Sequence, residues 1–152
     1  MDFYELLLTL HVLAAVVWVG GASATQVYAM RASRANEPAR LVGFTRDAEW
    51  IGTRVFLPMS LILVASGFGM IGDASLDFDA WIIIGLAIWL FSAGVGSSFL
   101  GPESGRIANI VEAEGPESPN AQARIQRIFL VSRIELVLLL LVVINMVVKP
   151  GA

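Results

Sequence analysis

The chain has no cysteine, a single histidine and few charged residues for its length of 152 residues. Without cysteine it can form no disulfide framework, thiolate nucleophile, iron–sulfur cluster or zinc–cysteine site. The single histidine, His11, excludes sites that need several histidines from one chain. Charged residues make up 15% of the sequence, against about 25% in soluble domains. The sequence therefore has too little charge to cover the surface of a soluble protein.

The apolar residues, 57% of the chain, predict an integral membrane protein. Such a composition excludes a disordered chain, and a net charge of −3 excludes a nucleic-acid binder with a basic face. A helix crosses the hydrocarbon layer with about 20 mainly apolar residues. We expect one domain over residues 1–152 and an all-α fold, an up-down-up-down four-helix bundle in the lipid bilayer. Its predicted spans are about residues 5–30, 53–72, 80–101 and 129–148.

The basic residues predict how the chain is oriented. All nine arginines lie between the first two spans, or between and just inside the last two, whereas Lys149 alone follows the fourth span. The loop between the second and third spans carries three aspartates and no base. Loops rich in arginine and lysine stay in the cytoplasm. We therefore expect a multi-pass protein of the bacterial cytoplasmic membrane with both termini outside.

The second predicted helix is longer than the bilayer is thick. Asn36-Glu37-Pro38 has the capping residue and early proline typical of a helix start. A helix over residues 38–71 would be on the order of 50 Å long, against about 30 Å of hydrocarbon. We expect Pro58 to kink this helix, because proline has no N–H to donate. One apolar face would run along it at steps of three and four, through Leu41, Phe44, Ala48, Ile51, Val55, Pro58 and Ile62.

Small residues and turn signals indicate how the helices connect and pack. A short amphipathic stretch follows Gly101-Pro102, and Gly115-Pro116 ends it. Small residues let membrane helices approach closely. Since they gather over residues 20–24 of the first span and 92–98 of the third, we expect those two helices to touch there. The turns are predicted at residues 31–36, 72–79 and 115–118.

His11 is the polar residue of the spans that most needs an explanation. It lies five residues into the first span, about 7 Å below the membrane boundary. Tyr4, Trp18 and Thr25 share its helix face at intervals of seven residues, and this stripe would suit a flat aromatic ligand. Alternatively, His11 packs the bundle through a hydrogen bond to Asn145 of the fourth span, which is a common kind of contact between membrane helices.

A ligand role for His11 limits the choice of cofactor. Haem b could take a neutral imidazole on iron, and without a second histidine a methionine would be the natural sixth ligand. Met70 and Met146 lie at the depth of His11. The same three side chains would suit copper as Cu(I), which favours thioether ligands. Flexible core packing without any cofactor is the alternative for each methionine.

The fourth span carries a second polar feature, Arg133 and Glu135. Two residues apart on a helix, these side chains point to different sides and cannot neutralise each other well. Arg54, at the inner end of the second span, lies at a suitable depth to pair with Glu135. The alternative is a functional one, in which Arg54 or Arg133 contacts a haem propionate or a substrate carboxylate.

The stretch from Leu10 to Gly21, with the pattern His-x6-Trp-x-Gly, resembles the start of several small bacterial membrane families. It is most similar to a family of predicted integral membrane proteins that carries only a domain-of-unknown-function label. More distantly it resembles the membrane domain of copper-resistance D proteins and the four-helix protoporphyrinogen oxidase, and the latter resemblance implies a haem-ligand role for His11. The chain departs from both, because its spans hold no lysine and no further histidine.

Three functional hypotheses follow, and none of them assigns a catalytic residue. The first is binding of haem or porphyrin through His11, with Trp18, Met70, Met146, Arg54 and Arg133 nearby, for electron transfer or tetrapyrrole handling. The second is a non-catalytic membrane partner or assembly protein, alone or as a homo-oligomer, whose cytoplasmic helices dock another protein. The third is copper handling through His11. No nucleic-acid partner is expected.

Overall fold

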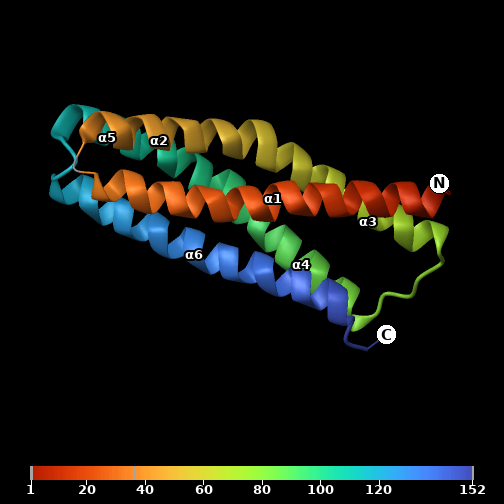
Figure 1. Ribbon diagram of the computed structural model, residues 1–152. Coiled ribbons are helices and arrows are strands. Elements are labelled where there is room, and N and C mark those ends of the chain that lie inside the picture. Colours follow the sequence, from red (N-terminus) through yellow and green to blue (C-terminus); the bar gives the residue numbers. More distant parts are fainter. Residues whose placement is uncertain (1, 36, 152) are drawn as a thin grey trace.

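The computed structural model describes residues 2–35 and 37–151, which form four long helices that run alternately up and down (Figure 1). The first is α1 (Phe3–Arg34). The second consists of α2 (Pro38–Ile51), the π-helical turn η1 (Gly52–Phe56) and α3 (Leu57–Asp73). The third consists of α4 (Ala80–Val95), the π-helical turn η2 (Gly96–Leu100) and α5 (Gly101–Glu114). The fourth is α6 (Pro119–Val148).

All four long helices are apolar enough to cross a membrane. They contain 32, 36, 35 and 30 residues, and each holds an 18-residue window of high hydropathy. Large apolar side chains such as Val16, Leu90 and Val147 are exposed along their outer faces. A soluble bundle would turn those side chains inward, whereas lipid accepts them. The predicted all-α membrane bundle is confirmed.

The two ends of the bundle differ. Both termini and the loop Ala74–Asp79 lie at one end, which we call the termini end (Figure 1). The other, the arginine end, holds the short links between α1 and α2 and between α5 and α6. The predicted turns agree, except that α1 continues to Arg34 and shortens the first one. Asn36, the expected capping residue, lies outside the described residues.

Each π turn lies just before a proline. Leu57 N–H donates to the carbonyl of Gly52, five residues back, and Pro58 follows; Gly101 N–H donates to Gly96 in the same way before Pro102. Because proline has no N–H, the helix must rearrange its hydrogen bonds around it, and a π turn does this without breaking the helix. The second helix is therefore continuous, as expected. The third is continuous too, so the separate stretch predicted after Gly101-Pro102 is wrong.

The helices do not pair as the small residues suggested. α1 packs along α3, α2 along α5, and α6 along both α4 and α5. The predicted seam between α1 and the α4–η2 segment is absent from this pattern. Instead, Gly21 of α1 faces the ring of Phe56, which would lie 2.6 Å from a Cβ at that position. Five of the ten other small residues in these two stretches line a cavity instead: Ala22, Ser92, Ala93, Gly96 and Ser97.

The arginine end has a hydrophobic core of its own. Buried apolar residues from α1, α2, α5 and α6 meet there: Ala32, Leu41, Ile107, Val111, Ala121 and Ile125. Beside them the buried carboxylate of Glu103 accepts a hydrogen bond from Arg124 at 2.7 Å and a longer one of 3.4 Å from Arg106. This end therefore packs as a water-soluble helical bundle does, with a continuous core and ion pairs around it.

One ion pair at this end is expected to contribute little. Arg46 of α2 and Glu112 of α5 approach to 2.8 Å, and both side chains are half exposed. Exposed pairs stabilise by under about 1 kcal/mol, because water screens them. The variant Arg46→Gln should therefore lower the free energy of unfolding by less than about 1 kcal/mol in an SDS titration of purified protein. A larger loss would mean that the pair is more buried than its exposure indicates.

Candidate functional site

Two cavities of the bundle contain candidate site residues or a buried charge, and the larger of these two lies in the termini half. We call it the histidine cavity; its volume is about 640 Å³, and its wall includes His11. Trp18, Met70 and Met146 line the same cavity. Four of the six residues singled out from the sequence therefore come together, from α1, α3 and α6. Tyr4, Phe68, Trp81 and Trp89 add aromatic rings to a wall that is mostly apolar.

His11 is held in a defined orientation by α3. Its Nδ1 lies 2.8 Å from the carbonyl oxygen of Leu63. A carbonyl can only accept, so Nδ1 carries the proton and Nε2 keeps a lone pair. The ring packs against Gly67, where an added Cβ would lie 3.4 Å from Cε1. A histidine fixed in this way through one nitrogen is the arrangement found in most histidine metal ligands.

The expected hydrogen bond between His11 and Asn145 is wrong. Asn145 Nδ2 instead donates to the carbonyl oxygen of Trp81 at 2.7 Å and so ties α6 to α4. Both residues do connect helices, as polar residues in membranes commonly do. Each side chain forms its hydrogen bond with a backbone carbonyl at a similar depth in the membrane. The sequence does not reveal which carbonyl that is.

Arg54 and Arg133 lie away from His11. Both are exposed, and they line neither cavity. The guanidinium of Arg133 stands 5.8 Å from the ring centroid of Phe129. The predicted ion pair between Arg54 and Glu135 is wrong, because no ion pair of Glu135 occurs among the residues that the structure describes.

Lys149 is a residue of the histidine cavity that sequence reasoning missed. Its Nζ lies 5.1 Å from the ring centroid of Trp81, and it is the only lysine or arginine on the cavity wall. The indole N–H of Trp81 is buried without a hydrogen-bond partner in the described part of the chain. The sequence could have pointed to Lys149, because it is the only basic residue predicted on the termini side of the membrane.

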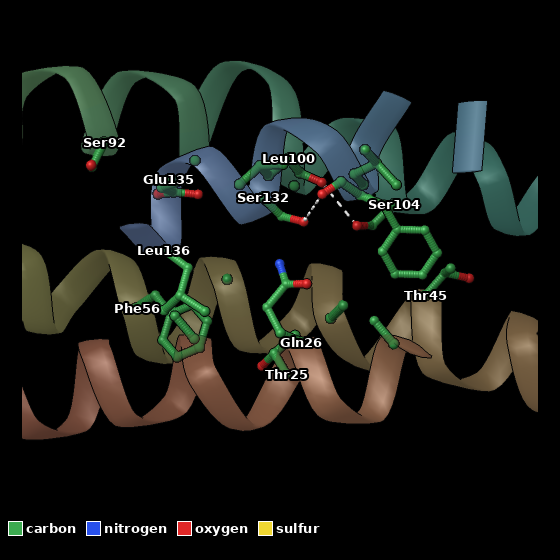
Figure 2. A pocket seen from close by; sticks show the side chains of 18 of the residues that line it. Thr25, Gln26, Thr45, Phe56, Ser92, Leu100, Ser104, Ser132, Glu135 and Leu136 are labelled. Atoms are coloured by element: carbon green, nitrogen blue, oxygen red, sulfur yellow. Dashed lines mark hydrogen bonds between the residues drawn. The ribbon is translucent and has the colours of Figure 1, made fainter. Parts of the chain in front are cut away.

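The second cavity lies toward the arginine end, where both π turns form part of its wall. We call it the glutamate cavity; its volume is about 350 Å³. Figure 2 shows Glu135 on α6, Ser92 on α4 and the side chain of Gln26 extending from α1 into the space between the helices. Trp18 and Leu139 line both cavities and separate them.

Comparison with known families agrees with this architecture. Residues 5–150 match the family described as predicted integral membrane protein, DUF2269. The chain belongs to this family. The resemblance to a membrane family of unknown function is thus confirmed. No curated protein and no solved structure matches the chain.

The donor set of this DUF2269 protein narrows what the histidine cavity can hold. Within residues 2–35 and 37–151 no three histidine, cysteine, aspartate or glutamate side chains cluster as for a metal ion. A bare hard cation would therefore find no cluster of carboxylates there. One imidazole, two thioethers and several aromatic rings fit a soft metal or a metal carried in a flat organic ring.

Proposed function

We propose that this membrane protein binds haem, or a related metalloporphyrin, in the histidine cavity with His11 as a ligand to the metal. The observation that carries the proposal is the 2.8 Å hydrogen bond from His11 Nδ1 to Leu63, which leaves Nε2 as a metal donor on a cavity wall. The cavity volume, about 640 Å³, lies within the range of roughly 300–1,000 Å³ for small-molecule sites.

The rest of the wall suits the same ligand. A porphyrin is a large apolar disc, and Trp18, Trp81 and Trp89 offer rings and apolar surface to it. Its carboxylates need a cation or donors; the Lys149 ammonium stands 5.1 Å from the centroid of the Trp81 ring, whose indole N–H has no partner among the described residues. These two residues replace Arg54 and Arg133 in the proposed carboxylate contact.

Met70 and Met146 are the proposed candidates for a second axial ligand, since both thioethers line the cavity. Bound iron would supply one-electron chemistry, which fits a role in electron transfer or tetrapyrrole handling. With the arginine end in the cytoplasm of a bacterium, as the nine arginines favour, the cavity lies in the outer half of the membrane. Copper is the second candidate, favoured by the same three side chains.

Haem titration of the purified protein in detergent tests this proposal. We expect a saturable Soret band at one haem per chain and a reduced-minus-oxidised difference spectrum. The variant His11→Ala should lose the band at haem concentrations that saturate the parent protein, because the iron loses its protein ligand. Met70→Leu and Met146→Leu should each be compared with Met59→Leu, which changes a methionine outside both cavities.

The outcomes separate the alternatives. A band that persists unchanged in His11→Ala would overturn the assignment of the ligand. Copper that co-purifies with the parent and disappears in His11→Ala would identify the protein as a copper binder instead. If the protein binds neither haem nor copper, the hypothesis of a non-catalytic membrane partner remains. Crosslinking should then recover a defined protein at the arginine end.

A further inference from the structure

The glutamate cavity contains a carboxyl group that forms no ion pair with the described residues of the chain. Glu135 lies at the middle of α6, is 8% exposed and, of the described residues, is the only charged one on the cavity wall. Its Oε1 lies 3.9 Å from the position that a Cβ on Gly96 would take, so the group faces η2. Its side chain makes no hydrogen bond or ion pair to any residue that the structure describes.

A carboxyl group in this position must either be protonated or be paired with a positive charge. Burying an ion without a partner costs far more free energy than burying a paired one. Acidic residues inside membrane spans are accordingly rare and usually mark ligand or ion pathways. The nearest basic residue along the helix, Arg133, is exposed and is not among the residues that line the cavity.

The remaining wall favours a cation with an apolar body. The rings of Trp18, Phe44, Phe56 and Phe129 line the cavity, and aromatic faces attract organic cations by about 0.5–2 kcal/mol. Ser92 Oγ, on the same wall, is fully buried without a hydrogen-bond partner in the described residues. Most other lining residues are apolar or small. A hydrated metal ion would find no second carboxylate here, whereas a quaternary or protonated amine would find rings and one negative charge.

We propose that the glutamate cavity binds a small lipophilic ammonium cation, which Glu135 neutralises and the aromatic rings surround. This site differs in place and chemistry from the metalloporphyrin site of the histidine cavity. Trp18 and Leu139 stand between the two cavities. Two of its walls are the π turns, which often occur at functional sites because they widen a helix locally.

The charge of the ligand is the property to test first. Radiolabelled benzyltrimethylammonium is bound to the protein in phosphatidylcholine nanodiscs, and binding to empty nanodiscs is subtracted. We expect saturable binding of one cation per chain. Neopentylbenzene, its uncharged carbon isostere, should fail to displace the cation at equal concentration. Displacement by this neutral analogue would overturn the proposal and identify the cavity as a pocket for neutral apolar molecules.

Two pairs of variants then test the carboxylate of Glu135 and the space beside Gly96. Glu135→Gln removes the charge without changing the size and should weaken cation binding at least about tenfold, which is 1.4 kcal/mol. Glu112→Gln changes an exposed carboxylate outside the cavity and should leave binding unchanged. Gly96→Leu fills the cavity and should abolish binding, whereas Gly94→Leu extends into open space and should have no effect.

The result does not depend on the histidine cavity. His11→Ala should bind the cation as the parent does, even if it binds no haem. Equal binding by Glu135→Gln and the parent would overturn the proposal. If Glu135→Gln does not fold, as judged by circular dichroism and gel filtration, the neutral analogue and the glycine pair decide the question on their own.

Discussion

Replacing Ile107 with alanine is expected to lower the free energy of unfolding by about 3 kcal/mol, among the largest effects that a single core truncation produces. Ile107 is 1% exposed and lies in the apolar core of the arginine end, with Leu41, Val111 and Ile125 around it. Truncation removes three carbon atoms and leaves a cavity that the long, stiff helices on either side cannot easily collapse to fill.

An SDS titration of the purified protein would measure this loss. Ile110→Ala is the matched control, because Ile110 lies one turn along the same helix but is only partly buried against the core. Its loss should be clearly smaller than that of Ile107→Ala. Equal losses would show that the core at the arginine end is not packed as described.

Removing Arg124 is expected to destabilise the protein by about 2–3 kcal/mol, more than removing both members of its ion pair. Glu103 is 2% exposed, and Arg124 supplies its short hydrogen bond of 2.7 Å between α5 and α6. In Arg124→Leu the buried carboxylate keeps only the longer contact with Arg106, whose side chain is largely exposed. A buried charge that loses its partner costs more than an apolar residue in its place.

The double variant Glu103→Leu/Arg124→Leu distinguishes this reason from simple loss of contact. Its free energy of unfolding should lie within about 1 kcal/mol of the parent value in the same titration, because the unpaired buried carboxylate of Glu103 is no longer present. Arg127→Leu is the control, since Arg127 is exposed and its guanidinium stands 5.2 Å from the ring centroid of Phe99. A double variant that is less stable than Arg124→Leu would contradict the argument.

The membrane architecture could be predicted from the sequence because the bilayer imposes length and apolarity on each helix. Runs of apolar residues, Pro38 at a helix start and Gly115 at a helix end are local signals, and they placed the first two helices within a few residues of their observed ends. The predicted fourth span begins ten residues after the observed start of α6 (Pro119–Val148). The third helix was predicted too short. Gly101-Pro102 reads as a break, yet the π turn before it carries the helix through.

The same π turns explain why one predicted helix face is only partly right. From Leu41 to Val55 the apolar residues at steps of three and four are buried or partly buried. Beyond η1 the pattern fails: Ile62 is 38% exposed, while Ser60 and Ser66 face the bundle. A periodicity argument assumes 3.6 residues per turn, and one wider turn shifts every later residue around the axis.

The site could be predicted in part for a related reason. His11 and Trp18 lie seven residues apart on one uninterrupted helix, and Met70 and Met146 share the depth of His11, so a common cavity wall is within reach of sequence reasoning. Depth also suggested Arg54 as the partner of Glu135, and this was wrong. Equal depth does not fix which way a side chain points, and that direction depends on the rotation of each helix in the bundle.

The two π turns also set the relative rotation of the halves of their helices. Each turn holds about one residue more than the α-helical turn it replaces, and one residue corresponds to roughly 100° of helix. Deleting one residue within Gly52–Phe56 would let that turn become α-helical and would swing Ser60 and Ser66 out of the bundle interior, while the core around Leu41 stayed in place. Chimeras between relatives must therefore preserve the length of this turn, even where its sequence is free to vary.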